Sequence, residues 1–518
     1  MIATETDTDD STHIAGRVDQ RPIAVVLDGP PTPAWQARAL AGLEASAALD
    51  IVEVRLAGRP RRSVVRRLQD ALERHVYEAG ADPYAPTHVV PRAPGGMPVT
   101  LLVWLSERPA PNEEQTDLLS LRHNGVVQPA EDAFSRALLD GAACVTSEAV
   151  LRHHGITVVA ERTVSGVRPF SATDSRTHAL WKLSAAVPRA VERLPGLGTP
   201  PDAPTQMGPP PATSALLLHT TTSLLRALAT RLLFRRPWSI RVRQRHAAPT
   251  RGWEHDNGLV RWADALTYAD PFLFEHEGGH HLFCEEVPSG LKRGVISHTE
   301  LRLDGTPADP PTPVLQASYH LSYPFLFAHE GEVFMIPESS AARQVELHRA
   351  VAFPHTWERA AILLHDVSAV DATIFAHDGL LWLFACVAAP AASAADELHV
   401  FWAEAPRGPW CPHARNPVVS DVRCARPAGA IQRWGARIVR PGQDCSRCYG
   451  GAISFREIDM LSPTAYAEHE IDRLEPGDLD DARATHTYAA DGRFEAIDLR
   501  RRELRLRRRV RDGGRPRR

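Results

Sequence analysis

The stretch ADPFLF at Ala269–Phe274 recurs in altered form further along the chain. Its echoes are SYPFLF at Ser322–Phe327 and VDATIF at Val370–Phe375. Each echo ends in phenylalanine and is followed by a hairpin turn and a second apolar strand. A repeat of about fifty residues with four short strands is typical of a β-propeller blade. The sequence therefore predicts a propeller in the second half of the chain.

One polar position varies from copy to copy when the echoes are aligned on their last phenylalanine. Asp270, Tyr323 and Asp371 share this register, 53 and 48 residues apart, and a weaker copy, ARPAGA, puts Arg426 another 55 residues on. Two leftover strands, WSIRVRQ and GRFEAIDLR, complete a fifth blade if the two ends of the segment at 236–500 close the ring together. We expect the constant phenylalanines to pack between blades and the variable residue to point into the central channel.

The first half of the chain alternates strands and helices. PIAVVLDG and IVEVRLAG are apolar strands on either side of a helical stretch, so a parallel sheet and an α/β fold are expected. A dinucleotide site needs a glycine-rich turn after the first strand, and LDGPPTPAW has one glycine, so no cofactor is expected. The predicted divisions are a disordered tail at 1–20, an α/β domain at 21–194, a proline-rich linker at 195–213, a helix at 214–235, a five-bladed propeller at 236–500 and a basic tail at 501–518.

The order of elements in the α/β domain resembles the formyltransferase fold. The Asn-x-His motif of that family is not matched by RHNGVVQPAE at 122–131. The resemblance therefore carries over no catalytic residue, and the domain is expected to be non-catalytic, with a structural role or a role in binding a partner protein.

Composition narrows the class of protein. Apolar residues at 43% and charged residues at 24% are those of a soluble globular protein, and the net charge of −4 argues against a nucleic-acid partner. The acidic start of the chain lacks the pattern of a secretory signal, and seven cysteines do not suggest a disulfide framework, so a cytoplasmic location is expected. The apolar stretch at Ala215–Phe234 contains His219, Arg226 and Arg231. It is interpreted as a buried or amphipathic helix, with weak membrane association as the alternative.

Glycosyl transfer or hydrolysis needs two carboxyl groups on either side of the glycosidic bond. Asp270 and Asp371 share the inner-strand register, and Glu338 follows Tyr323 by the same 15 residues that separate Asp270 from Glu285. We assign Asp270 as base or nucleophile, Glu338 as general acid, and Asp371 as the partner that tunes a pKa or binds sugar hydroxyls. The alternative is that these acids cap turns or are merely solvated.

The fourth blade is rich in guanidinium groups, which can clamp a phosphate or a uronate through paired hydrogen bonds. A network of arginine and aspartate that holds the blade together is the competing interpretation. His320 and Tyr323 in blade two and Glu285 in blade one are also predicted to contact the sugar. Aromatic packing is the alternative for His320 and Tyr323. The predicted substrate-binding residues are Glu285, His320, Tyr323, Arg423, Arg426, Asp444 and Arg447.

Two motifs suggest metal binding at first sight. HEGGHH at His276–His281 has two glycines at its centre and fits a hairpin turn better. CSRC at Cys445–Cys448 has no second pair at zinc-finger spacing. No metal site is expected.

The order and spacing of ADPFLF, SYPFLF, MIPESS, DATIF, LHVFWAEAPRGPWCPHARNPVVSDVRCARPAGA and RPGQDCSRCYGGAI resemble the N-terminal propeller domain of glucosamine inositolphosphorylceramide transferases and its bacterial relatives. More remotely, the propeller is similar to those of arabinanases, levansucrases and invertases, which place acids on inner strands around a sugar pocket. Those hydrolases usually bring their acid from a later blade, where this chain has Arg426. In the plant transferases a separate C-terminal domain is expected to transfer the sugar, so the resemblance does not by itself imply transferase activity here.

Together these patterns predict a carbohydrate-active protein that binds and processes a glycoside or sugar phosphate in surface-glycan metabolism. A catalytically silent glycan-binding or assembly module is the alternative, and a pure interaction scaffold is a third interpretation. The sequence leaves the sugar, the donor and the acceptor open.

Overall fold

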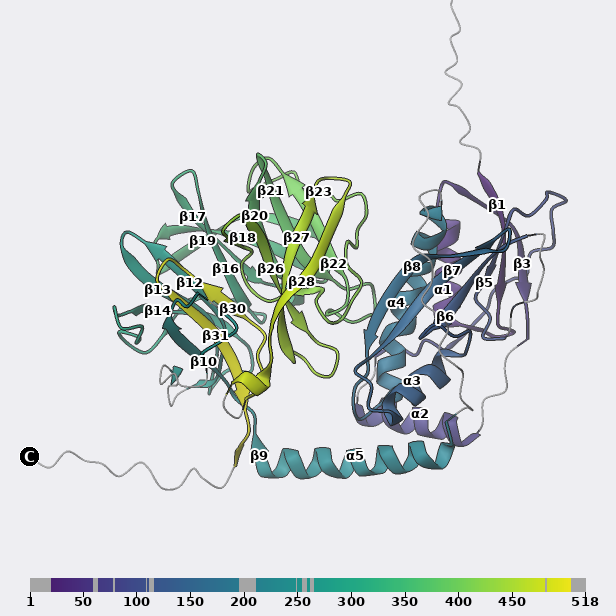
Figure 1. Cartoon of the computed structure of the whole chain (residues 1–518), viewed down its shortest axis with the longest axis horizontal. Helices are drawn as coiled ribbons and strands as arrows, with labels where there is room; N and C mark the ends of the chain where they lie inside the picture. The colour runs from purple at the N-terminus through teal and green to yellow at the C-terminus, as the bar shows by residue number, and fades with distance from the viewer. Residues whose placement is uncertain are drawn as a thin grey trace, which may run out of the picture.

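The computed structural model describes residues 20–58, 64–77, 80–108, 110, 116–194, 211–247, 249–253, 259–260, 265–479 and 482–504. These residues form an α/β domain and a β-propeller, and one long helix runs along the edge of the molecule between them (Figure 1). The predicted tail at 1–20 and most of the predicted linker at 195–213 lie outside the described residues.

The α/β domain is built on a six-stranded sheet. The sheet has the order β3-β1-β5-β6-β7-β8, in which β3, β1, β5 and β6 run parallel and β6, β7 and β8 pair antiparallel. The apolar runs of β1 and β5 are almost entirely buried, as expected for parallel strands covered on both faces. The elements are β1 (Arg21–Leu27), β2 (Thr32–Pro33), α1 (Ala34–Glu44), β3 (Leu49–Leu56), α2 (Val64–Tyr77), β4 (Pro86–Thr87), β5 (Leu101–Trp104), β6 (Asp117–His123), α3 (Ala130–Leu139), β7 (Cys144–His153), β8 (Ile156–Gly166) and α4 (Ala172–Glu192).

The predicted α/β fold is therefore confirmed. The order of elements does not by itself confirm the formyltransferase-like assignment, which stays a prediction. The long helix α4 packs against α1, α3 and β8 and forms much of the domain's core with them.

The second half of the chain folds into five β-sheets, which confirms the predicted five-bladed propeller. Blades one to three each consist of four consecutive strands, and blade four has a split first strand. Blade one is β12 (Ala265–His276), β13 (Gly279–Pro288), β14 (Val295–Leu301) and β15 (Thr312–Leu315). Blade two is β16 (Ser322–His329), β17 (Glu332–Glu338), β18 (Gln344–Ala352) and β19 (Thr356–His365). Blade three is β20 (Ala369–His377), β21 (Leu380–Val387), β22 (Leu398–Ala403) and β23 (Cys411–Pro412). Blade four is β24 (Arg426–Pro427), β25 (Gln432–Trp434), β26 (Arg437–Asp444), β27 (Ala452–Leu461) and β28 (Tyr466–Leu474).

Blade five is closed by strands from both ends of the propeller segment. Strand β10 (Trp238–Gln244) pairs antiparallel with β31 (Phe494–Arg501), from Trp238 opposite Arg500 to Gln244 opposite Phe494. The strands β11 (Leu259–Val260), β29 (Ala482–Ala484) and β30 (Tyr488–Ala490) complete the sheet. The predicted closure by WSIRVRQ and GRFEAIDLR is confirmed.

The varying residue of each echo has a backbone conformation that its neighbours lack. Asp270, Tyr323 and Asp371 have φ angles of +49°, +45° and +55°, and each lies where the pairing of its strand with the next one slips. This left-handed conformation costs roughly 1–2 kcal/mol per residue. Hydrogen bonds across the channel offset that cost, as described below. Two of the constant phenylalanines pack between blades as predicted. The ring of Phe274 lies 5.8 Å from that of Phe353 in blade two, and the guanidinium of Arg433 in blade four lies 5.3 Å from the ring of Phe375.

The α/β domain docks onto the propeller through backbone and charged side chains. Val164 of β8 donates to the carbonyl of Ser420 at 2.9 Å and accepts from Val422 at 3.1 Å. Lys182 of α4, which is buried, forms an ion pair of 3.0 Å with Asp396 of the propeller. The domain predicted to have a structural or partner-binding role thus packs tightly against the chain's own propeller.

The helix α5 (Thr213–Leu233) confirms the helix predicted from the apolar stretch, and of the two forms expected, buried or amphipathic, its exposure rules out the buried one. Among its residues, Leu216 and Thr220 are buried, and most of the others are at least partly exposed. After α5 the chain enters β9 (Phe234–Arg235), which pairs with β32 (Glu503–Leu504). None of the helices in the described residues has both the length and the hydropathy needed to cross a membrane.

Candidate functional site

The central channel is lined by one residue from each blade. Blades one to four contribute the register residues Asp270, Tyr323, Asp371 and Arg426. In blade five the same place is taken by His486, which lies in the unpaired step between β29 and β30. The variable position of the repeat therefore builds a ring of polar groups, as the sequence predicts.

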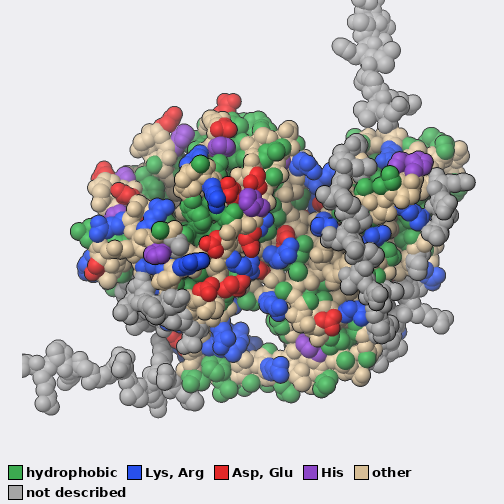
Figure 2. Space-filling model, viewed as in Figure 1, with side chains coloured by type: hydrophobic (Ala, Val, Ile, Leu, Met, Phe, Trp, Pro, Cys, Tyr) green, Lys and Arg blue, Asp and Glu red, His purple; other side chains and the backbone are tan. Residues whose placement is uncertain are grey.

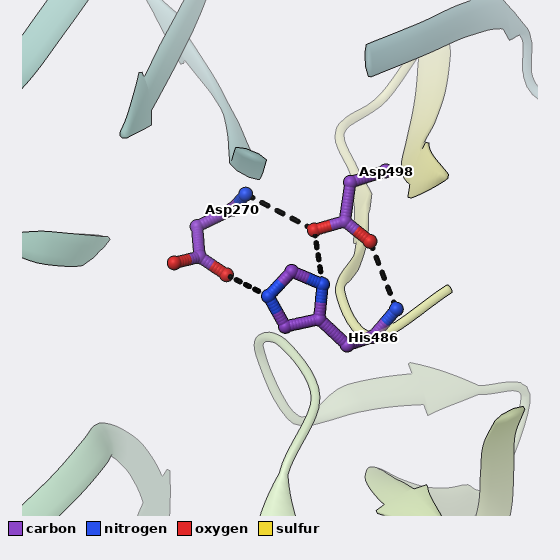
Figure 3. A group of neighbouring side chains, drawn as sticks. All are labelled: Asp270, His486 and Asp498. Carbon is purple, nitrogen blue, oxygen red and sulfur yellow. Dashed lines mark hydrogen bonds and ion pairs between the residues drawn. The ribbon is translucent and has the colours of Figure 1, made fainter. Parts of the chain in front are cut away.

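On one side of the channel, Asp270, His486 and Asp498 bind one another and form a closed cluster (Figure 3). The imidazole of His486 lies between two carboxylates, with Nε2 3.1 Å from Oδ1 of Asp270 and Nδ1 2.6 Å from Oδ2 of Asp498. Thr487 donates its hydroxyl to Oδ1 of Asp270 at 2.8 Å, and the amide of Tyr323 donates to Oδ2 at 3.1 Å. Asp270, His486 and Asp498 are at most 3% exposed. Both oxygens of Asp270 are thus occupied.

The charges of this cluster stabilise one another. Burial alone would lower the pKa of His486, but the carboxylates of Asp498 and Asp270 outweigh it and raise the pKa to about 10. Burial alone would raise the pKa of Asp270, but the charge of His486 and the hydrogen bonds from His486 and Thr487 lower it. The cluster is an imidazolium held between two carboxylates. Its ligand atoms lie within 4.8 Å of one another, a spacing that also suits a metal ion.

Next to this cluster, blades three and four form a second one, and the ring of Tyr449, 4.9 Å from that of His486, lies between the two. Arg426 donates to Oδ2 of Asp371 at 2.6 Å and to Oδ1 at 3.2 Å, and Gln443 donates to Oδ2 at 2.9 Å. The guanidinium of Arg426 also lies over the ring of Tyr449, 4.9 Å from its centroid. Burial raises the pKa of Asp371 to about 6; the charges of Asp270 and Glu338 add to this effect, and Arg426 opposes it. Asp371 therefore titrates close to neutrality.

This second cluster borders a cavity of about 170 Å³ between the two domains. Arg426, Tyr449, Cys445 and the segment around Asp396 come from the propeller, while the α/β domain supplies the end of β8 and the start of α4. The residues that line it are Ser165, Gly166, Arg168, Ser175, His178, Ser393, Ala394, Ala395, Asp396, Val422, Arg426, Cys445, Ser446 and Tyr449.

Among the residues that line this cavity, two buried polar atoms of the α/β domain lack a hydrogen-bond partner. The hydroxyl of Ser165, a residue 2% exposed, and Nδ1 of His178 are buried without a hydrogen-bond partner among the described residues. Arg168 beside them is held by Asp174 at 2.8 Å. Buried polar atoms usually have a partner, so these two atoms suggest that a ligand or water completes the site.

The predicted residues of blades one and two lie along the neighbouring wall of the channel. Glu285 accepts from Nε2 of His320 at 3.2 Å, and its pKa is raised, mainly by burial. The same carboxylate raises the pKa of His320. Glu338 accepts from the hydroxyl of Ser322 at 3.1 Å. The charges of Glu285 and Asp270 act on one another, as do those of Glu338 and Asp371, and the predicted roles of these acids stay predictions.

The remaining predicted residues of blade four make contacts within the protein. Arg423 pairs with Asp421 at 2.6 Å, Arg447 donates to the carbonyl of Gly141 at 3.1 Å, and Asp444 pairs with Arg473. The hydroxyl of Tyr323 forms a hydrogen bond of 3.0 Å with the hydroxyl of Thr373 and accepts one of 2.7 Å from the amide of Gly429. These contacts fit the structural interpretation, and the role of these residues in ligand binding stays a prediction.

The two motifs rejected as metal sites have the conformations expected of them. Glu277 and Gly278 lie in the turn between β12 and β13 with φ angles of +49° and +81°, which confirms the hairpin in HEGGHH. Cys445 and Cys448 are free thiols. In Cys445, burial raises the pKa to about 12.

Sequence reasoning missed His486, Asp498, Tyr449, Ser165 and His178. The fifth copy of the repeat, THTYAADG, lacks the phenylalanine of the first three copies, and its His486 lies 60 residues after Arg426. Counting strands from the closing pair would have placed His486 in the register. Ser165 and His178 belong to the α/β domain, and no spacing in the sequence indicates that this domain lines the cavity.

Comparison with known proteins shows what the propeller is similar to. Residues 263–499 match the family model described as "Glucosamine inositolphosphorylceramide transferase 1, N-terminal". Glucosamine inositolphosphorylceramide transferase 1 of Arabidopsis thaliana is 34% identical over 206 residues, which are 39% of this chain and 27% of the plant protein. The protein of the same name from Oryza sativa subsp. japonica is 32% identical over 203 residues, with the same two shares. The match thus spans about a quarter of the length of these relatives.

Solved structures with a similar fold come from sugar-degrading enzymes. The α-L-arabinanase of Cellvibrio cellulosa complexed with arabinohexaose has a TM-score of 0.30 at 14% identity, over 43% of this chain and 81% of that one. The family 117 glycoside hydrolase Zg3597 of Zobellia galactanivorans has a TM-score of 0.34 at 9% identity, over 50% and 90%. Scores this low add nothing to the architecture that the five sheets already show. The sequence matches do support the resemblance seen in the sequence: residues 263–499, less than half of this chain, are similar to the N-terminal domain of glucosamine inositolphosphorylceramide transferases.

Proposed function

We propose that this chain is a carbohydrate-active protein that binds and processes a sugar carrying a phosphate or carboxylate group in the cavity between its two domains. The observation that carries the proposal is the position of Arg426. Its guanidinium holds Asp371 in the channel and also lines the cavity. A cation placed in this way can share its remaining donors with an anionic ligand.

The relatives support the same chemical class. They are named for glucosamine and for inositolphosphorylceramide, a sugar and a phosphate-containing lipid. Their names describe proteins of which this chain matches about a quarter, so transfer of a sugar by this chain is part of the proposal.

Asp371 is 2% exposed, and both of its oxygens accept hydrogen bonds, from Arg426 and Gln443. It becomes the candidate proton donor at this site when a ligand takes over donors of Arg426. Its pKa of about 6 already lies well above the usual range for aspartate. An anionic group that shares Arg426 weakens the attraction that opposes the raised pKa, so the pKa rises further when the ligand binds. A carboxyl that is protonated near neutral pH can protonate the leaving oxygen of a glycoside or sugar phosphate.

A second carboxylate is needed on the other side of the bond that breaks. Glu338 is the better placed of the two remaining candidates, because it is partly exposed and interacts with Asp371 through its charge. Both oxygens of Glu338 accept hydrogen bonds, from Ser322 and Ser340, and both oxygens of Asp270 are occupied as well. Asp270, assigned from the sequence as base or nucleophile, is only 3% exposed and is also held in an ion pair with His486. We therefore favour Glu338 as the partner of Asp371.

A second candidate function, recognition of a sugar without turnover, is favoured by the same occupied state of Asp270. If the closed cluster is purely architectural, the ring has one carboxyl fewer for chemistry, and the cavity serves as a binding site. This alternative predicts saturable binding and no product.

The test is a mass-spectrometric turnover screen of the full chain against pooled glycosides, sugar phosphates and nucleotide sugars. Asp371→Asn and Glu338→Gln are compared with the wild type, and Asp366→Asn, an exposed aspartate whose side chain is 87% exposed, is the matched control. Product from the wild type and the control, with none from the other two variants, supports the proposal. Turnover that survives both Asp371→Asn and Glu338→Gln would contradict it, and binding without product would establish the second candidate.

A further inference from the structure

The solvent-facing side of α5 is rich in leucine. Leu218, Leu225 and Leu232 recur at intervals of seven residues and are 67%, 63% and 65% exposed. Leu228 between them is 55% exposed. Figure 2 shows hydrophobic side chains gathered along the outer edge of this helix, with basic side chains among them. Single exposed leucines are common on protein surfaces, but a row of them on one helix face often marks an interaction site.

The row lies on the side of the helix that faces away from the protein. Leu216 and Thr220 are the buried residues of α5. Leu225 is nine residues after Leu216 and so lies about half a turn round the helix axis from it. The packed side is thus occupied by the α/β domain, where Thr220 bonds Glu73 and Gln69 at 3.0 and 3.1 Å.

The helix is held at both ends, which fixes the direction of the leucine row. Near its start, Arg66 of α2 donates to the carbonyl of Pro211 at 2.9 Å. At its end, β9 pairs with β32, so the helix is tied to the propeller as well. Leu504 of β32 is 48% exposed at the same corner.

Positive charge is concentrated at this edge. The segment 213–236 contains four arginines, one histidine and neither aspartate nor glutamate. All four arginines are exposed; they are Arg226, Arg231, Arg235 and Arg236. The chain that continues from β32 outside the described residues, 505–518, has eight arginines and one aspartate. The sequence that follows β32 is therefore strongly basic.

We propose that the outer face of α5, defined as Leu218, Leu225, Leu228 and Leu232 with the flanking Arg226 and Arg231, docks onto the surface of an anionic lipid bilayer. A helix with exposed leucines and basic flanks lies in the plane of such a surface, with its apolar side chains inserted at the boundary between headgroups and acyl chains. The arginines of α5 and of 505–518 supply the attraction to anionic headgroups. This inference does not depend on the proposed sugar site.

The test is co-sedimentation of the full-length protein with vesicles. Vesicles of phosphatidylcholine alone are compared with vesicles that also contain phosphatidylglycerol, at low and at high salt. We expect binding to the anionic vesicles that weakens as salt rises, because salt screens the charges. Absence of binding to anionic vesicles at low salt would overturn the proposal.

Two variants separate insertion from simple charge attraction. Leu225→Gln with Leu232→Gln keeps the charge and the helix propensity of α5, and we expect a loss in vesicle affinity of about tenfold or more, since each buried leucine contributes strongly. Leu303→Gln, which changes an exposed leucine of the propeller (69% exposed), is the matched control and should bind as the wild type does. Circular dichroism checks that the double variant is folded.

Three other outcomes would overturn the proposal. One is unchanged vesicle binding by the leucine double variant, which would leave charge alone as the cause. Another is a dimer in light scattering that dissociates in the double variant, which would make the leucine row a contact between two copies of the chain. The third is binding to RNA that is tighter than binding to anionic vesicles and that does not change in the leucine double variant.

Discussion

The two sides of the propeller channel use the same position of the repeat for different purposes. In blades one and five, Asp270 faces His486 and Asp498, and the three groups neutralise one another behind a fully buried surface. In blades three and four, Asp371 faces Arg426, which also lines a cavity. One side is closed on itself, and the other has a charged group at the edge of an open space.

The difference shows that the register residue does not determine its own role. Asp270 and Asp371 have the same backbone conformation and the same place in the blade. Their pKa values nevertheless move in opposite directions. At Asp270 the charge of His486 and the hydrogen bonds from His486 and Thr487 outweigh burial, whereas at Asp371 burial and the charges of Asp270 and Glu338 outweigh Arg426. The neighbours decide which acid supports the fold and which one is available to a ligand.

The largest effect should come from opening the closed side. Asp270→Ala leaves the buried imidazolium of His486 with one carboxylate and removes the partner of the Tyr323 amide. Breaking a buried ion pair in this way costs about 3–5 kcal/mol. We expect the free energy of unfolding in urea to fall by that amount, while Glu404→Ala at an exposed position changes it by less than about 0.5 kcal/mol. A loss of similar size in both variants would mean that the cluster does not hold the ring together.

The pH dependence of stability sharpens the same contrast. The pKa of His486 is about 10 in the folded protein and near 6.5 when unfolded, so its stabilising contribution is complete below pH 6.5 and is lost as pH rises towards 10. We expect the unfolding free energy to fall over this range by at most about 1.4 kcal/mol per pH unit. His486→Gln should flatten the decline, whereas His469→Gln, which removes an exposed histidine, should leave it in place. Equal slopes in all three proteins would contradict the assignment.

On the open side, the first effect should appear in ligand affinity. Arg426→Gln removes the guanidinium that we propose for the anionic group, and a hydrogen bond to a charged group contributes about 1.5–3 kcal/mol. Titration calorimetry with sugar phosphates and uronates should show an affinity loss of about 10- to 100-fold. Arg349→Gln, which breaks exposed ion pairs with Glu332 and Glu358, is the matched control and should bind normally.

The smallest effect concerns the contribution of the α/β domain to the cavity. Ser165→Ala removes a buried hydroxyl that has no partner among the described residues, so the unfolding free energy should change by less than about 0.5 kcal/mol. Ligand affinity should fall by up to about tenfold, as expected for a neutral hydrogen bond. If affinity is unchanged and stability drops instead, the hydroxyl belongs to the packing of the domain interface.

The repeat made much of the fold predictable. The echoes located the inner strand of three blades and the register of Asp270, Tyr323 and Asp371, and the closing strands of blade five followed from the two leftover apolar runs. Alternating strands and helices predicted the α/β domain. The exposure of α5 was not predictable, because an apolar helix shows its period in the sequence but not which neighbours cover it.

The candidate site was predictable only in part. The acids and Arg426 were found because they share a repeat, but the pairing of Asp371 with Arg426 depends on which blades adjoin. His486 was missed because its copy of the repeat is the most divergent. Ser165 and His178 reach the cavity through the docking of two domains, which is a contact between distant segments that no local pattern encodes.

The most direct test of the two-sided channel is a crystal structure of the full chain with the sugar phosphate or uronate that binds most tightly in the calorimetric titration. We predict that the anionic group lies beside Arg426 and within reach of Ser165, and that Asp270, His486 and Asp498 keep their mutual contacts. A sugar bound against Asp270 with the closed cluster broken, or bound outside the channel altogether, would contradict the account.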